Sequence, residues 1–396
     1  MRDYCRDQVL HFSLRCYQLM GMHGLPLPCD AHPRRKARLL HVWAGCILMG
    51  LSGVSYMCLT SDDDFLYKGD DFSCFNDAMK FGFAEMAILS IYWETLSSQR
   101  VHLARFWHLY EVLAATHSAT TTPSGLTLWQ QLVQHWRFLL IFYGTFMLEL
   151  ALLCAYVALQ EGSRHLVLFW ITFQPFILVV HLRNTQFVLH MDLLRQKLLQ
   201  LERELILLVE YSSFANGSAS FFDFDKYLRR RVHEMQMIYA RIHELCTCFR
   251  RGFSYSMLTV LLMIYIRITV DSYFFLYTKL SNITNLDYYL LLPAVLHIPA
   301  FLYTSQSFMQ IVPRTAYQLH NIVISCSPVS LQIQNFSLEI LHEQMRIDCM
   351  GIVILDNHLL TQVSVSAATA KTHSSPTILD SLRRVYLHDL YRTADA

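Results

Sequence analysis

The chain has 396 residues, of which 54% are hydrophobic and 13% aromatic, while only 16% are charged. Soluble domains contain about 25% charged residues, so this composition is typical of a membrane protein. The net charge of +1 provides no field that attracts nucleic acid, and no Lys/Arg block is interleaved with stacking aromatics. We therefore expect a lipid bilayer as the surroundings and no nucleic-acid partner.

Six segments are apolar enough and long enough to cross a bilayer as helices, since a span needs roughly 20 mainly apolar residues. Residues 1–38 precede them, four spans fall within 39–183, and two fall within 253–311. The sequence predicts these spans at residues 39–59, 73–96, 136–160, 165–182, 253–278 and 287–311.

Basic residues predict the orientation, because Lys and Arg beside a span tend to stay in the cytoplasm. Residues 1–38 contain seven Lys/Arg, whereas residues 61–72 contain one Lys and five Asp. The N-terminus is therefore expected inside, and the segment 184–252, with ten Lys/Arg, also falls inside. The loop before the sixth span falls outside and carries a glycosylation sequon at Asn282.

Two apolar stripes with alternating spacings of three and four predict two long amphipathic helices in the inner segment 184–252. Their apolar faces form either the core of the chain itself or a surface shared between subunits. The stripes consist of Phe187, Met191, Leu194, Leu198, Leu201, Leu205 and Leu208, and of Leu228, Val232, Met235, Ile238, Ile242, Leu245 and Phe249.

Ionisable side chains inside the expected spans point to a functional site, because a charge in hydrocarbon is costly unless it is paired or hydrated. Arg267 and Asp271 are four residues apart, on one helix face, where they are able to neutralise each other. Together with aromatic side chains in the outer half of the spans, they suit a pocket for a small organic ligand. Structural pairing and plain packing are the alternative readings. The candidate residues are Glu149, Tyr156, Phe173, Arg267, Asp271, Tyr273, Tyr288 and His297.

Sequence motifs give no support for catalysis. The chain contains no GxSxG, HExxH, P-loop or dinucleotide fingerprint, and its 11 cysteines show no CxxC pair or zinc-site spacing. The HE dipeptides at His233 and His243 are ten residues apart, too far for one metal site on a straight helix. We expect no enzyme, no cofactor and no metal.

The segment FSLEILHEQMRIDCMGIVILDNHLL, residues 336–360, resembles the stretch that leads into the last helix of insect gustatory receptors. The matching positions are Phe336, Ser337, Leu341, His342, Gly351, Leu355, Asp356, Leu359 and Leu360. The resemblance implies an all-α, polytopic helical bundle with cytoplasmic helix extensions, an inverted orientation relative to G-protein-coupled receptors, and a tetrameric cation channel opened by tastants. It also implies that residues 312–360 hold a cytoplasmic helix and the start, at Gly351, of a pore-lining seventh helix.

Residues 361–396 depart from the family pattern, which continues with about twenty apolar residues and a Thr-Tyr signature. This chain instead reads TQVSVSAATAKTHSSP and onward, a polar tail that is costly to insert into a bilayer. A replaced C-terminus and a polar seventh helix that lines a wet pore are the two readings. The expected function is a gustatory receptor subunit in the plasma membrane of a sensory neuron; the alternatives are a non-conducting accessory subunit and a solute transporter.

Overall fold

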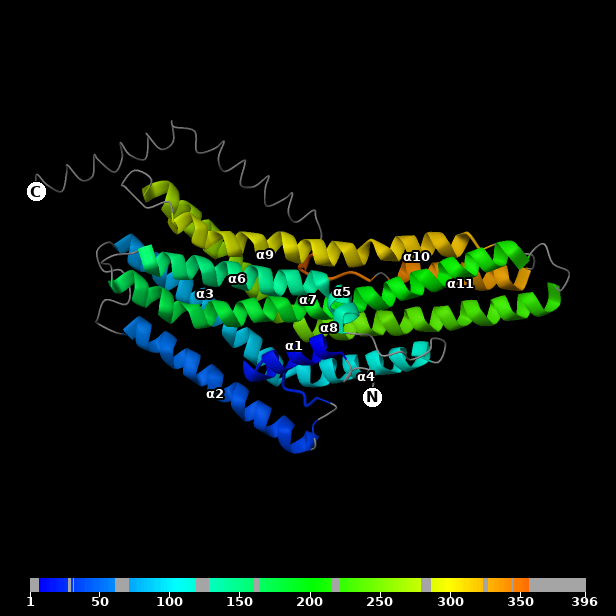
Figure 1. Ribbon diagram of the computed structural model, residues 1–396, viewed down its shortest axis with the longest axis horizontal. Coiled ribbons are helices and arrows are strands. Elements are labelled where there is room, and N and C mark those ends of the chain that lie inside the picture. Colours follow the sequence, from blue (N-terminus) through cyan, green and yellow to red (C-terminus); the bar gives the residue numbers. More distant parts are fainter. Residues whose placement is uncertain are drawn as a thin grey trace, which may run out of the picture.

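A computed structural model describes residues 7–27, 30, 32–60, 71–118, 128–159, 164–215, 221–278, 286–322, 327–343 and 345–355. These residues form an elongated, all-α bundle (Figure 1). The elements are α1 Gln8–Leu19, α2 Pro33–Thr60, α3 Asp71–Leu96, α4 Ser98–Ser118, α5 Leu128–Gln134, α6 Trp136–Leu159, α7 Arg164–Ala215, α8 Phe221–Thr278, α9 Leu286–Met309, α10 Ile311–His320, α11 Ser327–His342, β1 Asp348–Cys349 and β2 Val353–Ile354.

Helices cover all six expected spans, in the order α2, α3, α6, α7, α8 and α9. Three stretches of the described chain are long and apolar enough to cross a membrane by composition: Pro33–Cys58, Trp136–Ala155 and Phe224–Val270. The crossing of a membrane by α3, α7 and α9, and the division of the chain into outer, membrane and inner parts, stay predictions.

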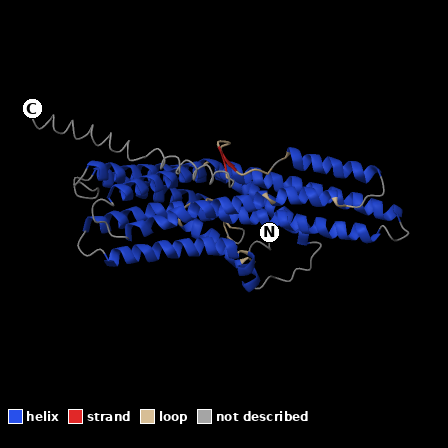
Figure 2. Cartoon of the chain, turned by 90° about the horizontal axis from the view of Figure 1, so that it is seen from above, coloured by secondary structure: helices blue, strands red, loops and turns tan. Residues whose placement is uncertain are grey.

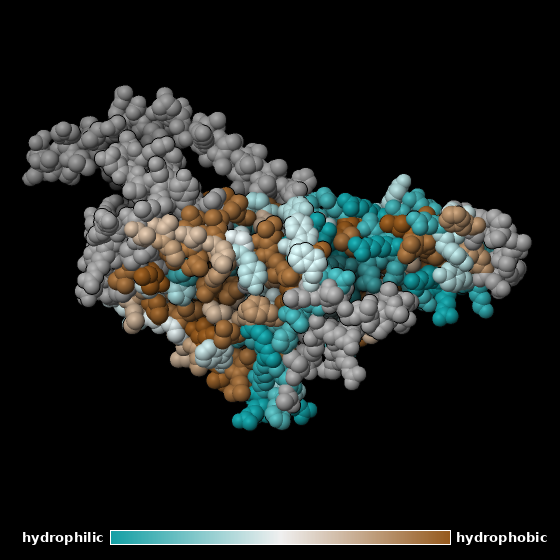
Figure 3. All heavy atoms as spheres, in the orientation of Figure 1, coloured by the Kyte–Doolittle hydropathy of each residue, from teal (hydrophilic) through white to brown (hydrophobic). Residues whose placement is uncertain are grey.

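The two longest helices run through the expected boundaries at residues 183 and 252 without a break. At about 1.5 Å per residue, the 52-residue α7 is about 78 Å long and the 58-residue α8 about 87 Å. Both greatly exceed the hydrocarbon thickness of about 30 Å. The space-filling view shows apolar surface over one end of the bundle and polar surface over the other (Figure 3). The described residues of the segment 184–252 therefore continue α7 and α8 directly from the stretches that are predicted to span the bilayer.

The two predicted stripes pack inside the bundle, as the amphipathic pattern requires. Every residue in them is buried, and the most exposed, Ile238, is only 7% exposed. Tyr239 on α8 meets Phe336 on α11 edge to face, with ring centroids 5.8 Å apart. The stripes thus form the core of the chain itself.

Helix α4 was not predicted from the sequence, because its apolar periodicity is weak. It follows α3 after Ser97 and packs on α8.

A buried ion pair joins α3, α7 and α8 near the middle of the molecule. Arg183 is fully buried and donates from Nη2 to Glu94 Oε2 over 2.5 Å, while its Nε donates to Ser256 Oγ over 2.9 Å. Its guanidinium lies over the Phe253 ring, 4.3 Å from the centroid. The backbone N–H of Tyr255 donates to the second carboxylate oxygen of Glu94 over 3.0 Å. We call these five residues the Arg183 centre.

After α11 the chain forms a two-stranded antiparallel hairpin, which is drawn as the red strands in Figure 2. Gly351 has a positive φ of 71°, and its N–H donates to Asp348 Oδ2 over 2.6 Å. The expectation that a seventh helix starts at Gly351 is therefore wrong for residues 351–355, because the turn chemistry of the DCMG sequence outweighs its apolar character. Asp356 and Leu360 lie outside the described residues.

The family-motif residues before the hairpin hold α11 in place. Phe336 is fully buried against α8, and Ser337 Oγ lies 2.9 Å from His320 Nε2 on α10. The hairpin is tied to α8 by Arg250 Nη1, which is 2.9 Å from Asp348 Oδ1, and by Ser254, which bonds the backbone N–H of Met350. The hairpin therefore docks directly beside the Arg183 centre.

Candidate functional site

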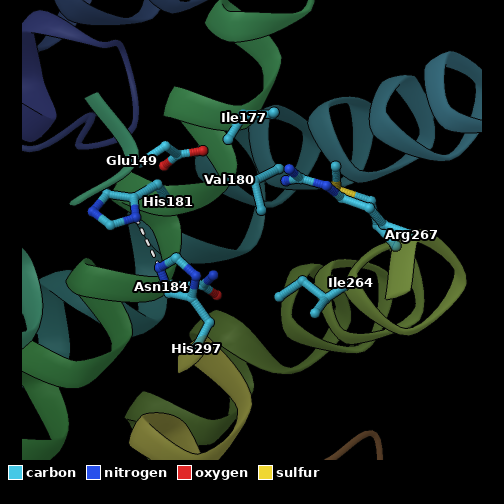
Figure 4. A pocket seen from close by; sticks show the side chains of 9 residues that line it. Glu149, Ile177, Val180, His181, Asn184, Ile264, Arg267 and His297 are labelled. Atoms are coloured by element: carbon cyan, nitrogen blue, oxygen red, sulfur yellow. Dashed lines mark hydrogen bonds between the residues drawn. The ribbon is translucent and has the colours of Figure 1, made fainter. Parts of the chain in front are cut away.

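A small cavity lies between α6, α7, α8 and α9, in the part of the bundle where the predicted spans pack together (Figure 4). Side chains from all four helices line the cavity. The lining residues are Glu149 from α6, Ile177, Val180, His181 and Asn184 from α7, Met263, Ile264 and Arg267 from α8, and His297 from α9.

Two histidines connect α7 and α9 at one side of the cavity. His181 Nδ1 and His297 Nε2 are 2.8 Å apart, and the ring centroids are 4.8 Å apart in an edge-to-face arrangement. Thr145 Oγ1 on α6 lies 3.5 Å from the other His181 nitrogen. Since one imidazole nitrogen must donate and the other accept, this hydrogen bond fixes complementary tautomers.

A carboxylate and a guanidinium line the same cavity from different helices. Glu149 and Arg267 are both less than 10% exposed, and the positive charge of Arg267 acts on the Glu149 carboxylate. Four apolar side chains separate and surround these groups: Ile177, Val180, Met263 and Ile264. Such a mixture of apolar walls with a few converging polar groups is typical of sites for small organic molecules.

The cavity is contracted in this conformation. The cavity volume is about 20 Å³, which is room for a single water. A drug-sized ligand needs a pocket of roughly 300 Å³ or more. Side chains or helices must therefore move before a ligand of that size enters, and a displacement of α6 or α9 would couple occupancy to the rest of the bundle.

Three of the eight predicted ligand residues come together here. Glu149, Arg267 and His297 lie far apart in sequence and line one cavity. Phe173 lies elsewhere: it is buried in an aromatic cluster, edge to face with Phe81 at 5.1 Å between centroids and stacked on Phe176 at 6.2 Å. The remaining predicted residues belong to helices by their backbone, but their side chains lie outside the described part: Tyr156, Asp271, Tyr273 and Tyr288. Asn282 also lies outside it.

Two polar residues of the cavity, His181 and Asn184, were not predicted from the sequence. The signal that selects Glu149 and Arg267, an ionisable side chain within an apolar span, also selects His181. Asn184 lies three residues further along α7, on the same helix face. Among the described residues, no group of His, Cys, Asp and Glu side chains is arranged to hold a metal ion.

Comparison with protein families classifies the chain. The family model described as 7tm chemosensory receptor matches residues 10–370, which is most of the sequence. The protein therefore belongs to the 7tm chemosensory receptor family, and the predicted resemblance to insect chemoreceptors is confirmed at this level. The match continues past Leu360, where the notable departure from the gustatory pattern begins.

Solved structures with the same fold include the insect olfactory receptor OR5 from Machilis hrabei. It aligns with a TM-score of 0.55 and 12% identity, covering 93% of this chain and 98% of that chain. The same receptor in complex with eugenol aligns with a TM-score of 0.55 and 11% identity, covering 93% and 97%. Identities this low indicate a shared fold only. No curated protein sequence matches the chain.

Proposed function

We propose that the protein is a gustatory chemoreceptor that binds small tastant molecules in the cavity between α6 and α9. It acts as a subunit of a tetrameric, ligand-gated cation channel in the plasma membrane, with its N-terminus in the cytoplasm. The convergence of Glu149, Arg267 and His297 on one buried cavity is the observation that carries this proposal. Membership of the chemosensory receptor family and the gustatory-like segment 336–360 support it.

The ligand class follows from the lining. A molecule with a hydroxyl, carbonyl or amine group satisfies Arg267, Glu149 or the histidine pair, while its carbon skeleton packs against the four apolar side chains. The related olfactory receptor OR5 binds eugenol, a small aromatic molecule. A small organic tastant with one or two polar groups fits the cavity lining and is similar in kind to the ligand of OR5.

The hairpin favours a second candidate, a non-conducting accessory subunit. Residues 351–355 form the turn and second strand where the family resemblance leads into the pore-lining helix. In that role the chain contributes a ligand cavity and packing surfaces to a mixed assembly, while the other subunits line the pore.

Electrophysiology separates the two candidates. The chain is expressed in oocytes alone and together with an intact gustatory receptor, and currents are recorded against a panel of sugars, alkaloids and phenolics. Ligand-dependent currents from the chain alone support the channel. Currents only in the mixture, with a ligand profile that differs from that of the intact receptor alone, support the accessory subunit. Unaltered currents in the mixture and none from the chain alone contradict both.

A pocket variant then tests the cavity. We expect Arg267→Met to raise the half-maximal ligand concentration by about tenfold or more, since a hydrogen bond to a charged group contributes about 1.5–3 kcal/mol. Arg229→Met, on an exposed position of the same helix, is the matched control and should leave the response unchanged. Equal responses from the two variants at equal surface expression would remove Arg267 from the ligand site.

A further inference from the structure

A second, much larger groove lies where α4, the α5–α6 junction and the middle of α7 meet. Its volume is about 560 Å³. It is lined by Tyr110, Val133, Gln134, Trp136, Arg137, Arg195, Gln196, Lys197, Leu199, Gln200 and Arg203. Four of these are basic, and none of the residues lining the groove in the described part of the chain is Asp or Glu.

The basic side chains are held in place by the helix register and by aromatic rings. Arg195 and Arg203 are eight residues apart on α7, so they lie on one helix face with Leu199 between them. The Arg137 guanidinium lies over the rings of Trp136 and Tyr303, 5.6 Å from each centroid, and the Lys197 ammonium lies 4.9 Å from the Tyr110 centroid.

Positive charge is crowded at this groove. Burial, and then the nearby charge of Arg137, lowers the pKa of Arg195, and Arg314 on α10 acts in the same direction. The acidic neighbour is Asp192, whose Oδ1 is 3.9 Å from Arg195 Nη1. The other Asp192 oxygen is engaged by Gln196 at 2.9 Å and by His135 at 3.5 Å. This crowding of positive charge favours a bound anion.

The groove lies at the level where the surface of the bundle changes from apolar to polar. Figure 1 places α5 between the end of the bundle that holds α6 and the end that holds α11, and Figure 3 shows apolar surface over the first and polar surface over the second. Trp129 and Trp136 are 73% and 54% exposed at this level. Exposed tryptophans beside a basic cluster are typical of the boundary between hydrocarbon and headgroups.

We propose that this groove binds the multiply phosphorylated headgroup of an anionic lipid in the inner leaflet. Arg195, Arg203 and Lys197 contact the phosphates, while Trp136 packs at the acyl-chain boundary. Guanidinium groups form paired hydrogen bonds to phosphate oxygens, and the groove is large enough for an inositol ring with its phosphates. The site is separate from the tastant cavity and does not depend on it.

Native mass spectrometry of the detergent-solubilised full chain measures this binding directly. Phosphatidylinositol bisphosphate and phosphatidylcholine are titrated separately, and soluble inositol trisphosphate forms a third arm that carries the same chemistry without acyl chains. We expect the bisphosphate lipid to bind at least about tenfold more tightly than phosphatidylcholine, and more tightly than inositol trisphosphate, with an affinity that falls as salt rises.

Charge-matched variants locate the site. The double variant Arg195→Gln/Arg203→Gln should weaken binding of the bisphosphate lipid by about tenfold, whereas Lys226→Gln/Arg229→Gln removes two exposed charges from α8 and should change it by less than about twofold. Arg195→Lys/Arg203→Lys should retain most of the affinity. Should the first double variant fail to fold, Arg203→Gln alone, at an exposed position, is compared with Arg229→Gln and should weaken binding about fivefold.

Three results overturn the proposal. Equal affinities in the groove and control variants show that the phosphates bind elsewhere. Equal affinities for phosphatidylcholine and the bisphosphate lipid show that charge is not recognised. An affinity for inositol trisphosphate that equals the affinity for the lipid shows that the groove binds a soluble phosphate.

Discussion

Within the described part of the chain, Arg183 is buried with Glu94 and Arg267 is buried near Glu149, and the two sites are built differently. In the Arg183 centre, both Glu94 oxygens and each guanidinium nitrogen of Arg183 have hydrogen-bond partners among Ser256, Tyr255, Gln186 and each other. In the cavity between α6 and α9, Glu149 and Arg267 both line a space with room for a single water, and the charge of Arg267 acts on the Glu149 carboxylate. The Arg183 centre is closed by packed side chains, whereas the second site borders a cavity.

This contrast assigns different roles to similar residues. A buried ion pair whose hydrogen bonds are complete holds helices together, and removing one partner leaves an uncompensated charge in the core. Charged groups that line a cavity are within reach of a molecule that fills it. The Arg183 centre therefore connects α3, α7 and α8 structurally, and the cavity is the site where we propose that a ligand changes the packing of α6 and α9.

The largest effect is expected from Arg183→Met. Because the side chain is fully buried, the substitution leaves Glu94 without its charged partner and should destabilise the fold by about 3–5 kcal/mol. The loss is measured as a fall in thermal unfolding temperature by fluorescence-detected size exclusion of the detergent-solubilised protein. The double variant Glu94→Gln/Arg183→Met should recover part of it, and equal stability of the single variant and the parent would contradict the structural role.

The second expected effect is a dependence of the stability of the fold on pH. It comes from His135, a buried residue between α5 and α6. Its Nε2 lies 2.8 Å from Asp7 Oδ2 and its Nδ1 lies 3.5 Å from Asp192 Oδ2. Burial lowers the pKa of His135, but the hydrogen bonds and charges of Asp192 and Asp7 outweigh it and raise the pKa to about 9. The protonated imidazole thus ties the start of α1 to α7.

Since the folded-state pKa is raised, the stabilisation is complete below the ordinary value of about 6.5 and is lost as pH rises through about 9. The shift corresponds to roughly 3 kcal/mol. Unfolding temperatures measured between these two pH values should fall for the parent and fall less for His135→Gln. Parallel curves for the two proteins would show that His135 is not charged in the fold.

A smaller effect is expected from Gly351→Ala in the hairpin that docks beside the Arg183 centre. A left-handed backbone costs a residue with a Cβ about 1 kcal/mol relative to glycine, so alanine should weaken the hairpin by that amount. If residue 351 instead began a helix, alanine would stabilise it, because glycine is the poorer helix former. Gly351→Asn, which tolerates this conformation, is the control. Limited proteolysis next to Arg346 measures whether alanine weakens or strengthens the local structure: faster cleavage than in the parent indicates a weakened hairpin.

The sequence predicted the helices well because their signals are local. Length and hydropathy located the helices that cover the six spans, and alternating spacings located both stripes, including Leu201 and Ile242. The Arg183 centre was not predicted, since pairing between α3 and α7 depends on three-dimensional packing. The cavity was predicted in part: the cost of charge in hydrocarbon selected Glu149 and Arg267, but that rule does not tell which charged side chains meet at one cavity.

The smallest effect on stability is expected where the effect on binding is largest, in the double variant Glu149→Gln/Arg267→Met. Replacing both members of a buried pair by neutral groups of similar volume is nearly neutral, so the unfolding temperature should correspond to a change within about 1 kcal/mol. Ligand responses should nonetheless be lost, because the variant removes both charged groups that line the cavity.

A loss of stability as large as that of Arg183→Met would show that Glu149 and Arg267 hold the bundle together in the same way as the Arg183 centre. The distinction between the two sites would then disappear. Retained stability with retained responses would place ligand binding elsewhere in the chain. Measuring both quantities on one preparation therefore decides whether the open space beside Glu149 and Arg267 is a binding site or a packing defect.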